Sequence, residues 1–526
     1  MNHIELFAGC GGLSLGLESI GFELVLANEL SPMAAETFAF NFFNENLEEK
    51  ANQNQSANNA IWLNSKYSDL KPRLRENPFE FPALDQEGHS DIPDDLSMLN
   101  GKLVVGSIIE LNKLLESSPV LTEQLQCAFN RNGGLDLVSG GPPCQSFSMA
   151  GKREKNSDKN TLPWEFAKFV NITRPKVVLL ENVTGILRPF KDEEGNSFHA
   201  WYEVSKVFAS IGYIPLCLHV NARKAGVAQN RPRFILIGVR QDHFNTIKDS
   251  FNTIEQEIFS QSEVFFELVE KHGEKLEFGK LNYYDSNKPS DLHIFEGSFL
   301  NSLVGTEEVS VSEAIDDLKV HNPSTQSSFV QHLNERFDNL ESRSELQNHE
   351  LRNNSPIVKR RFRLYQVLQQ VGQRSITQSV FKILKGETDS LEDIAWESLS
   401  GFEYLHENGE LYQFATKLEF ENYLKAHPTK KQTQKALIAD LPAPAALSIP
   451  DDACHYDDHE LRVLTVREMA RIQSFPDNFV FRSKITTGGQ MRKFEVPQYT
   501  QVGNAVPPIL GAALGRTIYQ LLLAND

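Results

Sequence analysis

The sequence lacks the features of membrane proteins and of proteins held together by disulfides or zinc. No apolar run reaches the roughly 18 residues that a membrane-spanning helix needs, and the first residues show no basic segment followed by an apolar one. The cysteines are few, odd in number and form no Cys-x-x-Cys pair; they are Cys10, Cys127, Cys144, Cys217 and Cys454. These absences exclude a disulfide framework and a zinc cluster, and predict a metal-free protein of the reducing cytoplasm.

Basic charge is also scarce. The chain of 526 residues has 52 Lys and Arg against 70 Asp and Glu, a net charge of −18, which is opposite in sign to a typical nucleic-acid binder. Local clustering decides the field at a groove, however, and residues 351–386 contain no acidic residue. A solvated helix face would account for this stretch, but its interleaved aromatic and amide side chains suit contact with phosphates and bases. The candidate contacts are Arg352, Arg360, Arg361 and Arg363.

Short apolar, β-branched runs alternate with helical patterns through the first 240 residues. The expected strands cover residues 3–8, 23–28, 102–106, 135–139, 176–180, 213–220 and 233–239. Expected helices include residues 13–19 and 164–172. This alternation predicts an α/β fold with a mostly parallel sheet covered on both faces, and ligands bound at the carboxyl ends of the strands.

Two stretches interrupt the alternation. Residues 45–100 are rich in Asn, Gln, Ala, Pro and acidic residues, which indicates a partly disordered surface insertion. From residue 242 to 459 the composition becomes polar and helix-leaning, which indicates a separate domain before a closing apolar helix at residues 508–523. We therefore expect a catalytic domain at 1–241, a variable domain at 242–494 and a C-terminal segment at 495–526 that returns to the first.

A glycine-rich turn follows the first expected strand and opens a helix. Gly9, Gly11 and Gly12 would let the backbone approach a ligand, while the third glycine of a dinucleotide fingerprint is replaced by Ser14. Glu29 ends the second strand, where a carboxylate can bind ribose hydroxyls. The pattern indicates a nucleoside site, or else a tight packing turn, and does not by itself separate a nicotinamide dinucleotide from S-adenosylmethionine.

Three further segments, each at the end or start of a later strand, carry reactive or charged side chains. Cys144 comes directly after Gly141, Pro142 and Pro143, and the next residues, to 160, form a small, polar, basic stretch suited to a lid over an anionic substrate. Glu181 ends a buried strand, and Arg231 with Arg233 introduces the last strand. Taken singly, each has an inert explanation: a buried thiol, a structural ion pair, or salt-bridge arginines.

Together these segments resemble the prokaryotic single-chain DNA cytosine-5 methyltransferases in order and spacing. The resemblance continues through residues 462–477 and 501–508 and covers about half of the chain. It implies a Rossmann-like methyltransferase sheet with a target-recognition domain inserted before the C-terminal helix. It also implies restriction–modification or phage defence, with double-stranded DNA as partner. A cognate nuclease is a candidate second partner whose existence the sequence does not decide, and we expect a monomer.

The resemblance assigns roles to the catalytic residues. Cys144 would add to C6 of a flipped cytosine, Glu181 would contact N3 and N4, and Arg233 would hold O2, with Arg231 in support. The base that removes the C5 proton is not identified; a water molecule is the candidate. The predicted DNA contacts also include Gln145, Ser146, Lys152 and Arg153.

The resemblance further implies S-adenosylmethionine as cofactor. Phe7 would stack on adenine, Glu29 would bind the ribose, and the glycine turn would line the methionine end. The other expected cofactor residues are Ser107, Ile108, Pro143, Asn504 and Val506. Ser107 stands where the family has an acidic residue for the adenine amine, which leaves that contact open.

Two alternatives remain beside this interpretation. A tRNA cytosine-5 methyltransferase of the same family would have a compact variable region and a Cys-Phe-Thr tripeptide, and the chain has neither. A catalytically inactive DNA-binding regulator would have lost Cys144, Glu181 or the two arginines, and all are present. A dehydrogenase is disfavoured because the third fingerprint glycine is missing.

Overall fold

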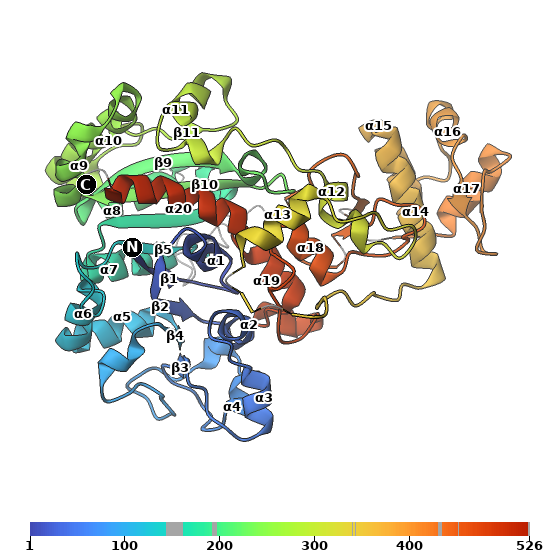
Figure 1. Ribbon diagram of the computed structural model, residues 1–526. Helices are drawn as coiled ribbons and strands as arrows, with labels where there is room; N and C mark the ends of the chain where they lie inside the picture. Colours follow the sequence, from blue (N-terminus) through green and yellow to red (C-terminus); the bar gives the residue numbers. More distant parts are fainter. Residues whose placement is uncertain are drawn as a thin grey trace.

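The computed structural model describes residues 1–143, 161–191, 197–338, 340–341, 343–429, 434–445, 447–450 and 452–523. Cys144, Gln145, Ser146, Lys152 and Arg153 lie outside the described residues. The centre of the molecule is a sheet with nine strands in the described part of the chain (Figure 1). In sheet order they are β11 (Tyr284–Asp285), β9 (Tyr213–Asn221), β10 (Pro232–Arg240), β6 (Val177–Val183), β5 (Leu137–Gly140), β1 (Asn2–Leu6), β2 (Glu23–Glu29), β4 (Lys102–Val105) and β3 (Ala60–Trp62).

The sheet is parallel except at β10, which runs antiparallel to both β6 and β9. β1 pairs in parallel with β2 and β5, and β5 with β6. The predicted α/β fold with a Rossmann-like methyltransferase sheet is confirmed, and each of the expected strands is present with bounds that differ by a few residues. The sequence signal was strong because strands covered on both faces are apolar throughout; Val177, Val178, Leu179 and Leu180 of β6 are all fully buried.

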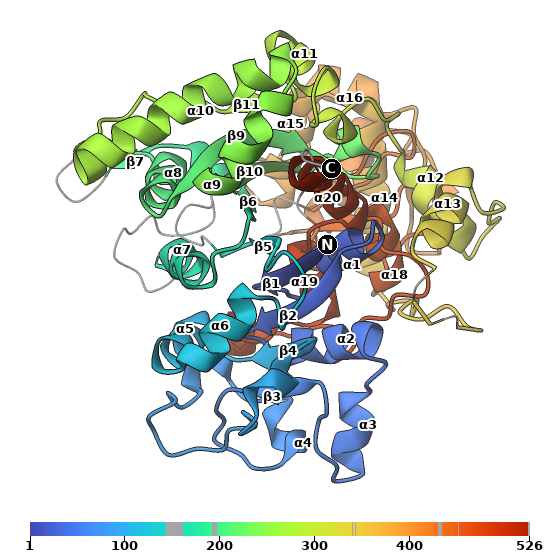
Figure 2. The same ribbon diagram turned by 60° about the vertical axis from the view of Figure 1, so that its left-hand side comes forward.

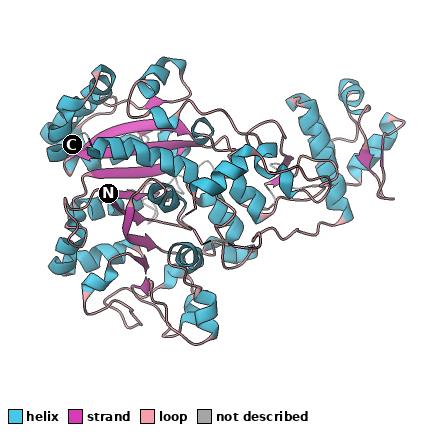
Figure 3. Cartoon of the chain, viewed as in Figure 1, coloured by secondary structure: helices cyan, strands magenta, loops and turns pink. Residues whose placement is uncertain are grey.

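Helices cover both faces of the sheet (Figure 2). One face carries α5 (Ile108–Ser117), α6 (Pro119–Gln126), α7 (Leu162–Thr173) and α8 (Ala200–Ser210). The other carries α1 (Gly12–Glu18), α2 (Pro32–Phe42) and α20 (Pro508–Leu523). The cartoon coloured by secondary structure shows the same layers (Figure 3).

The C-terminal helix α20 packs directly along α1. The backbones approach so closely that a Cβ added to Gly16 would lie 2.5 Å from both the Ala512 nitrogen and the Pro508 oxygen. A Cβ added to Gly511 would in turn lie 3.3 Å from the Leu13 oxygen. Glycines on both helices are therefore what joins the last segment of the chain to the first.

Residues 45–100 are ordered rather than partly disordered, which corrects the expectation from composition. They form α3 (Leu47–Asn52), β3, α4 (Leu70–Arg73) and the short 3-10 turns η1 (Pro78–Glu80) and η2 (Leu96–Leu99). Trp62 and Leu74 are buried in a cluster with Phe38 of α2. The few apolar residues of this polar segment are spaced so that they meet the sheet edge, a long-range contact that composition does not reveal.

The second half of the chain contributes to two cores. Residues 244–340 bury their apolar side chains against the sheet and α8, in the same cluster as β9 and β10. A second core gathers residues 362–463. The elements between β10 and the second core are α9 (Gln241–Ile247), α10 (Thr253–His272), α11 (Leu292–Glu296), α12 (Val311–Ile315) and α13 (Ser328–Arg336).

The second core forms a unit that projects away from the sheet, shown in yellow to orange in Figure 1. Its main helices are α14 (Pro356–Val371), α15 (Arg374–Leu384), α16 (Asp393–Leu399) and α17 (Lys417–Lys425). Two short strand pairs accompany these helices: β12–β13 (Tyr404–Leu405, Leu411–Tyr412) and β14–β15 (Lys435–Ala436, Ala453–Cys454). A third pair, β7–β8 (Phe190–Lys191, Ser197–Phe198), belongs to the first half of the chain, between β6 and α8. The chain then returns through α18 (Val466–Ile472) and α19 (Gln498–Asn504) to α20.

Within the described chain, no single helix has the length and apolar composition to cross a membrane. A bent pair, residues 489–504 with 508–523 at 67°, meets the length and composition criterion together.

Candidate active site

A cavity of about 530 Å³ lies at the carboxyl ends of the central strands. Its size falls in the range of about 300–1,000 Å³ that is usual for small-molecule sites. Residues from both ends of the chain line it, since the segment before α20 closes over the strand ends. The sequence-predicted residues on its wall are Phe7, Gly9, Gly12, Glu29, Ser107, Ile108, Pro143, Glu181, Arg231, Arg233, Asn504 and Val506.

Glu29 is fixed at the end of β2 by two backbone amides. Gly9 N donates to its Oε2 at 2.8 Å, and Ser31 N donates to its Oε1 at 2.7 Å. Burial raises the pKa of this carboxyl, while the amide hydrogen bonds favour the charged form. The side chain stands where a ribose is bound in folds of this type.

The two glycines at the start of α1 have different roles. A Cβ on Gly12 would lie 2.3 Å from the Val506 oxygen, so this glycine admits the C-terminal segment to the cavity wall. Gly11 has a φ of 93° and caps α1, and a Cβ there would lie 2.3 Å from Phe42 Cε2. Gly11 is absent from the cavity wall. It therefore serves the turn and the packing of α2, and its predicted cofactor contact has no support in this geometry.

Glu5 is a buried acidic residue on the cavity wall that the sequence interpretation overlooked. Both the backbone nitrogen and the hydroxyl of Ser14 donate to its Oε2, the former at 2.9 Å. Burial raises the pKa of Glu5 to about 8. Ser14, at the position of the missing fingerprint glycine, thus partners a carboxyl inside β1. A carboxylate flanked by Ile4 and Leu6 in a buried strand was the available signal.

At the other end of the cavity, Glu181 of β6 meets Arg233 of β10. Arg233 Nε lies 2.6 Å from Glu181 Oε1, and both side chains are largely shielded from solvent. The glycine–proline segment packs against this pair: a Cβ on Gly141 would lie 3.0 Å from Glu181 Oε2, and Asn182 Nδ2 donates to the Pro142 oxygen at 2.9 Å. Residues 141–143, directly before Cys144, are therefore held beside Glu181.

Arg231 holds the C-terminal segment in place. Its buried Nη2 donates to the oxygens of Gly503 and Ala505, at 2.9 and 3.0 Å. Between these two carbonyls lies Asn504, which is exposed to the cavity. Arg231 thus clamps β10 to the loop that precedes α20; its expected support of the Cys144 thiol or its loop stays a prediction.

Comparison with known proteins agrees with this geometry. The profile of the family described as C-5 cytosine-specific DNA methylase matches residues 1–63 and 122–520, and leaves residues 64–121 unmatched. The chain belongs to this family. The type II methyltransferase M.DdeI of Desulfomicrobium norvegicum is 25% identical over 526 residues, which span 98% of this chain and 88% of that protein. M1.HphI of Haemophilus parahaemolyticus is 23% identical, across 99% and 87% of the two chains.

A solved structure shares the fold of this methylase. A protein assigned as a DNA modification methyltransferase encoded within a prophage (E. coli) superposes with a TM-score of 0.51 and 18% identity, over 99% of both chains. Membership of the family makes this chain a DNA cytosine-5 methyltransferase, an enzyme that acts on DNA and needs a methyl donor.

The predicted DNA contacts of the methylase differ in exposure. Arg352 is exposed, and its Nη1 lies 3.5 Å from Thr486 Oγ1. Arg360 and Arg361 are half-buried and donate to His427 Nε2 at 2.7 Å and the Pro428 oxygen at 2.8 Å. Arg363 lies inside the second core, where its Nε donates to the Glu403 oxygen at 2.9 Å. Its burial conflicts with the expected DNA contact, because α14 turns this position inward; the sequence pattern alone did not distinguish the two faces of the helix.

Two further basic residues lie at the cavity. Arg492 and Lys493 are exposed, belong to the 3-10 turn η11 (Gly489–Lys493) and line the same cavity as Glu29. The segment that carries them also contains Thr486, the neighbour of Arg352. The long-range fold therefore brings the start of the basic stretch close to the segment that borders the cavity, which sequence spacing did not indicate.

Residues 462–477 form a buried segment that lies between the two cores. Arg467 is fully buried and donates to the oxygens of Pro476 and Phe479, at 2.8 and 2.6 Å. Arg471 is paired with Asp477 at 2.8 Å and with Asp317 at 2.6 Å. These charges are satisfied by partners within the protein, which accounts for their burial.

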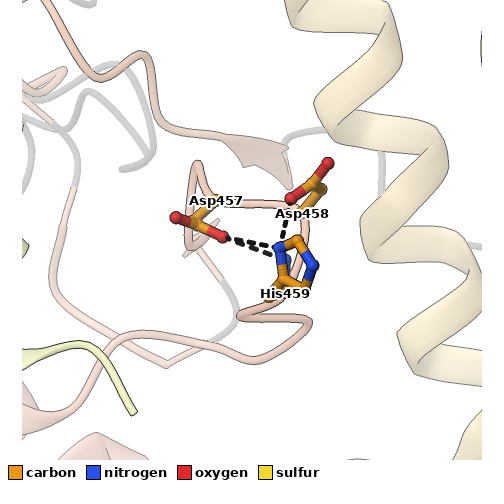
Figure 4. Close-up of side chains that lie close together, drawn as sticks. All are labelled: Asp457, Asp458 and His459. Atoms are coloured by element: carbon orange, nitrogen blue, oxygen red, sulfur yellow. Dashed lines mark hydrogen bonds and ion pairs between the residues drawn. The ribbon is translucent and has the colours of Figure 1, made fainter. Parts of the chain in front are cut away.

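One compact acid–histidine group lies at the edge of the second core. His459 Nδ1 is 2.7 Å from Asp458 Oδ1 and 3.6 Å from Asp457 Oδ1 (Figure 4). Asp457 is also paired with Lys319 at 3.1 Å. A lysine that neutralises the carboxylate makes this group an ordinary surface ion-pair cluster.

Proposed function

We propose that this methylase transfers a methyl group from S-adenosylmethionine to C5 of a flipped cytosine, through a covalent bond between Cys144 and C6. One observation carries the proposal: a single cavity has the amide-held carboxylate of Glu29 at one end and the Glu181–Arg233 pair at the other. A donor bound at the first end would face a base bound at the second.

The residues present fit S-adenosylmethionine, which supplies an electrophilic methyl group when bound. Glu29 would accept hydrogen bonds from the ribose hydroxyls, and Phe7 would pack on the adenine. The backbone of Gly9 and Gly12 would line the methionine end. Asn504 and Val506, held by the Arg231 clamp, would complete the wall on the side of the C-terminal segment.

Cys144 is the nucleophile in this mechanism. Its thiolate adds to C6, the electron pair moves to C5, and C5 takes the methyl group, which leaves S-adenosylhomocysteine; loss of the C5 proton and elimination of the thiolate then restore the C5–C6 double bond and the aromatic ring. Glu181 would hold N3 and N4, and Arg233 would hold O2. Cys10, the described cysteine on the same wall, is a poor alternative because burial raises the pKa of its thiol.

The substrate base must leave the duplex to reach this cavity. We infer that the unit built on the second core, with Arg352, Arg361 and the turn of Arg492 and Lys493, contacts the DNA and selects the sequence. The related type II methyltransferases point to a role in restriction–modification. The proposed substrate is therefore duplex DNA that contains a specific recognition sequence.

The test is a trapping experiment with duplex DNA that contains 5-fluorocytosine, since fluorine cannot leave C5 as a proton. Incubation of the wild-type enzyme with S-adenosylmethionine should give a denaturant-stable adduct that maps to Cys144. Cys144→Ala should give no adduct and no methylation, yet bind S-adenosylhomocysteine normally. An active wild-type enzyme that forms no adduct, or a methylating Cys144→Ala variant, would overturn the mechanism. Bisulfite sequencing of DNA from expressing cells would identify the methylated sequence.

A further inference from the structure

Three hydrogen-bonding side chains connect the edge strand β11 with the end of β6. His219 Nδ1, on β9, lies 3.0 Å from Asp285 Oδ2 on β11, and His219 Nε2 lies 3.2 Å from Thr184 Oγ1. Thr184 directly follows β6 and begins the 3-10 turn η4 (Thr184–Leu187). The side chains of His219 and Asp285 are only 12% and 14% exposed, so water competes little for these bonds. These three side chains form the Asp285–His219–Thr184 network.

The network ends at the backbone between the two arginines of the site. Thr184 Oγ1 donates to the Pro232 oxygen at 3.2 Å. The same oxygen accepts from Arg233 Nη1 at 2.8 Å, and Arg233 Nε lies 2.6 Å from Glu181 Oε1. One carbonyl group therefore connects the network to the guanidinium that is paired with Glu181.

The directions of the hydrogen bonds follow from the number of hydrogens. A threonine hydroxyl has one hydrogen, so its donation to Pro232 leaves its oxygen to accept from His219 Nε2–H. His219 Nδ1–H donates to Asp285, which makes the ring an imidazolium beside a carboxylate. Burial alone would raise the pKa of Asp285, but hydrogen bonds from His219 and Asn287 outweigh burial and lower that pKa. The charged carboxylate thus balances the imidazolium.

The network is anchored at the end that lies far from the cavity. The backbone nitrogen and Nδ2 of Asn287 donate to Asp285 Oδ1, at 2.9 and 3.0 Å. Ser286 N donates to the His219 oxygen at 2.9 Å, and the Tyr283 ring packs edge-on against the His219 ring, with 6.3 Å between centroids. These contacts fix both the carboxylate and the imidazole.

We propose that the members of this network are positioning residues for Arg233, because they fix the carbonyl that its guanidinium binds. A displacement of about 1 Å in a group that holds a substrate can slow a reaction by up to about a hundredfold. The inference rests on the proposed function, since it takes Arg233 as the group that holds O2 of the flipped cytosine. Asp285 lies within residues 242–494, so a segment that the composition sets apart from the catalytic domain would support its active site.

Tritium transfer from S-adenosylmethionine to unmethylated genomic DNA tests the proposal. Thr184→Val keeps the shape of the side chain and removes the hydroxyl. It should lower kcat by about tenfold and leave KM for S-adenosylmethionine within about twofold of wild type. His219→Leu should have the same effect, because it removes the group that holds the hydroxyl. Thr184→Ser, which returns the hydroxyl, should restore kcat to within about threefold of wild type.

A double-mutant cycle shows whether the effect passes through Arg233. Arg233→Lys removes the Nη1 bond to the Pro232 oxygen. In that background Thr184→Val should change kcat by less than about twofold, since the connection is already broken. Thr173→Val is the matched control: Thr173 is buried and its hydroxyl donates to the Phe169 oxygen within α7 at 2.9 Å, so this variant should lose thermal stability and keep kcat.

The outcomes separate the inference from the proposed function. A Thr184→Val variant with the kcat of wild type would overturn the inference alone, as would an equal loss of about tenfold in both backgrounds. A wild-type enzyme that transfers no tritium to DNA would overturn the proposed function and the inference with it. Thermal melting defines an assay temperature at which every variant is folded.

Discussion

Replacing Gly12 with alanine tests how the two ends of the chain build the cofactor site. The added Cβ would lie 2.3 Å from the Val506 oxygen and 3.1 Å from Phe475 Cζ, where real contacts are rarely shorter than 3.0 Å. The Val506 carbonyl must therefore retreat by about 0.7 Å. It has little freedom to do so, because the neighbouring Ala505 oxygen is bound to Arg231 and α20 begins two residues later.

Two opposing effects determine how much Gly12→Ala lowers the free energy of unfolding. Overpacking a rigid contact destabilises by about 1–3 kcal/mol, while alanine at a helical position recovers up to about 1 kcal/mol relative to glycine. Gly12→Ala should thus lower the free energy of unfolding by about 1–2 kcal/mol. Because Val506 and Asn504 line the cavity, affinity for S-adenosylhomocysteine should fall by about tenfold, equivalent to about 1.4 kcal/mol.

Urea denaturation and isothermal titration with S-adenosylhomocysteine measure the two effects. Gly21→Ala is the control: Gly21 has a φ of 93° and a Cβ added there would meet no atom within 4 Å, so alanine introduces backbone strain without a steric contact. It should cost about 1 kcal/mol of stability and leave ligand affinity unchanged. Wild-type affinity in Gly12→Ala would refute the idea that the close approach of Val506 shapes the site.

Three further predictions concern charged side chains. Glu5 is protonated in the folded state up to about pH 8 and ionises near 4.5 when unfolded, so it lowers the free energy of unfolding by about 1.4 kcal/mol per unit as pH rises between those values. Glu5→Gln should melt like wild type near pH 4.5 and at a higher temperature near pH 8; parallel melting curves at both pH values would contradict this. Arg231→Ala should weaken S-adenosylhomocysteine binding by about tenfold through loss of two charge-assisted hydrogen bonds to the loop of Asn504, and unchanged affinity would argue against the clamp. Arg492→Ala should lower DNA affinity and reduce the slope of log affinity against log salt concentration by about 0.9. The control Lys248→Ala, at a site between α9 and α10, should change neither the affinity nor the slope. Equal slopes for wild type and Arg492→Ala would show that Arg492 does not contact the DNA.

Local patterns in the sequence were sufficient to place the strands and to choose the chemistry. Strands buried on both faces are continuous apolar runs, and functional residues in such sheets follow the strand ends. That is why Glu29, Glu181 and Arg233 could be named before any tertiary contact was known. Their order and residue types also carried the resemblance to the family.

Contacts between distant segments were decided by the tertiary structure alone. Whether a glycine lies on a cavity wall or packs against a neighbouring helix depends on the segments around it. Gly12 lies on the cavity wall, whereas Gly11 packs against α2. Whether an arginine of α14 faces solvent or a core depends on the rotation of the helix, which separates the half-buried Arg361 from the buried Arg363. The insertion at residues 45–100 is a further example: its composition indicates a surface loop, and only its packing on the sheet edge brings Phe79 to the wall of the central cavity. Residue type and spacing are local properties, whereas burial is set by the whole fold.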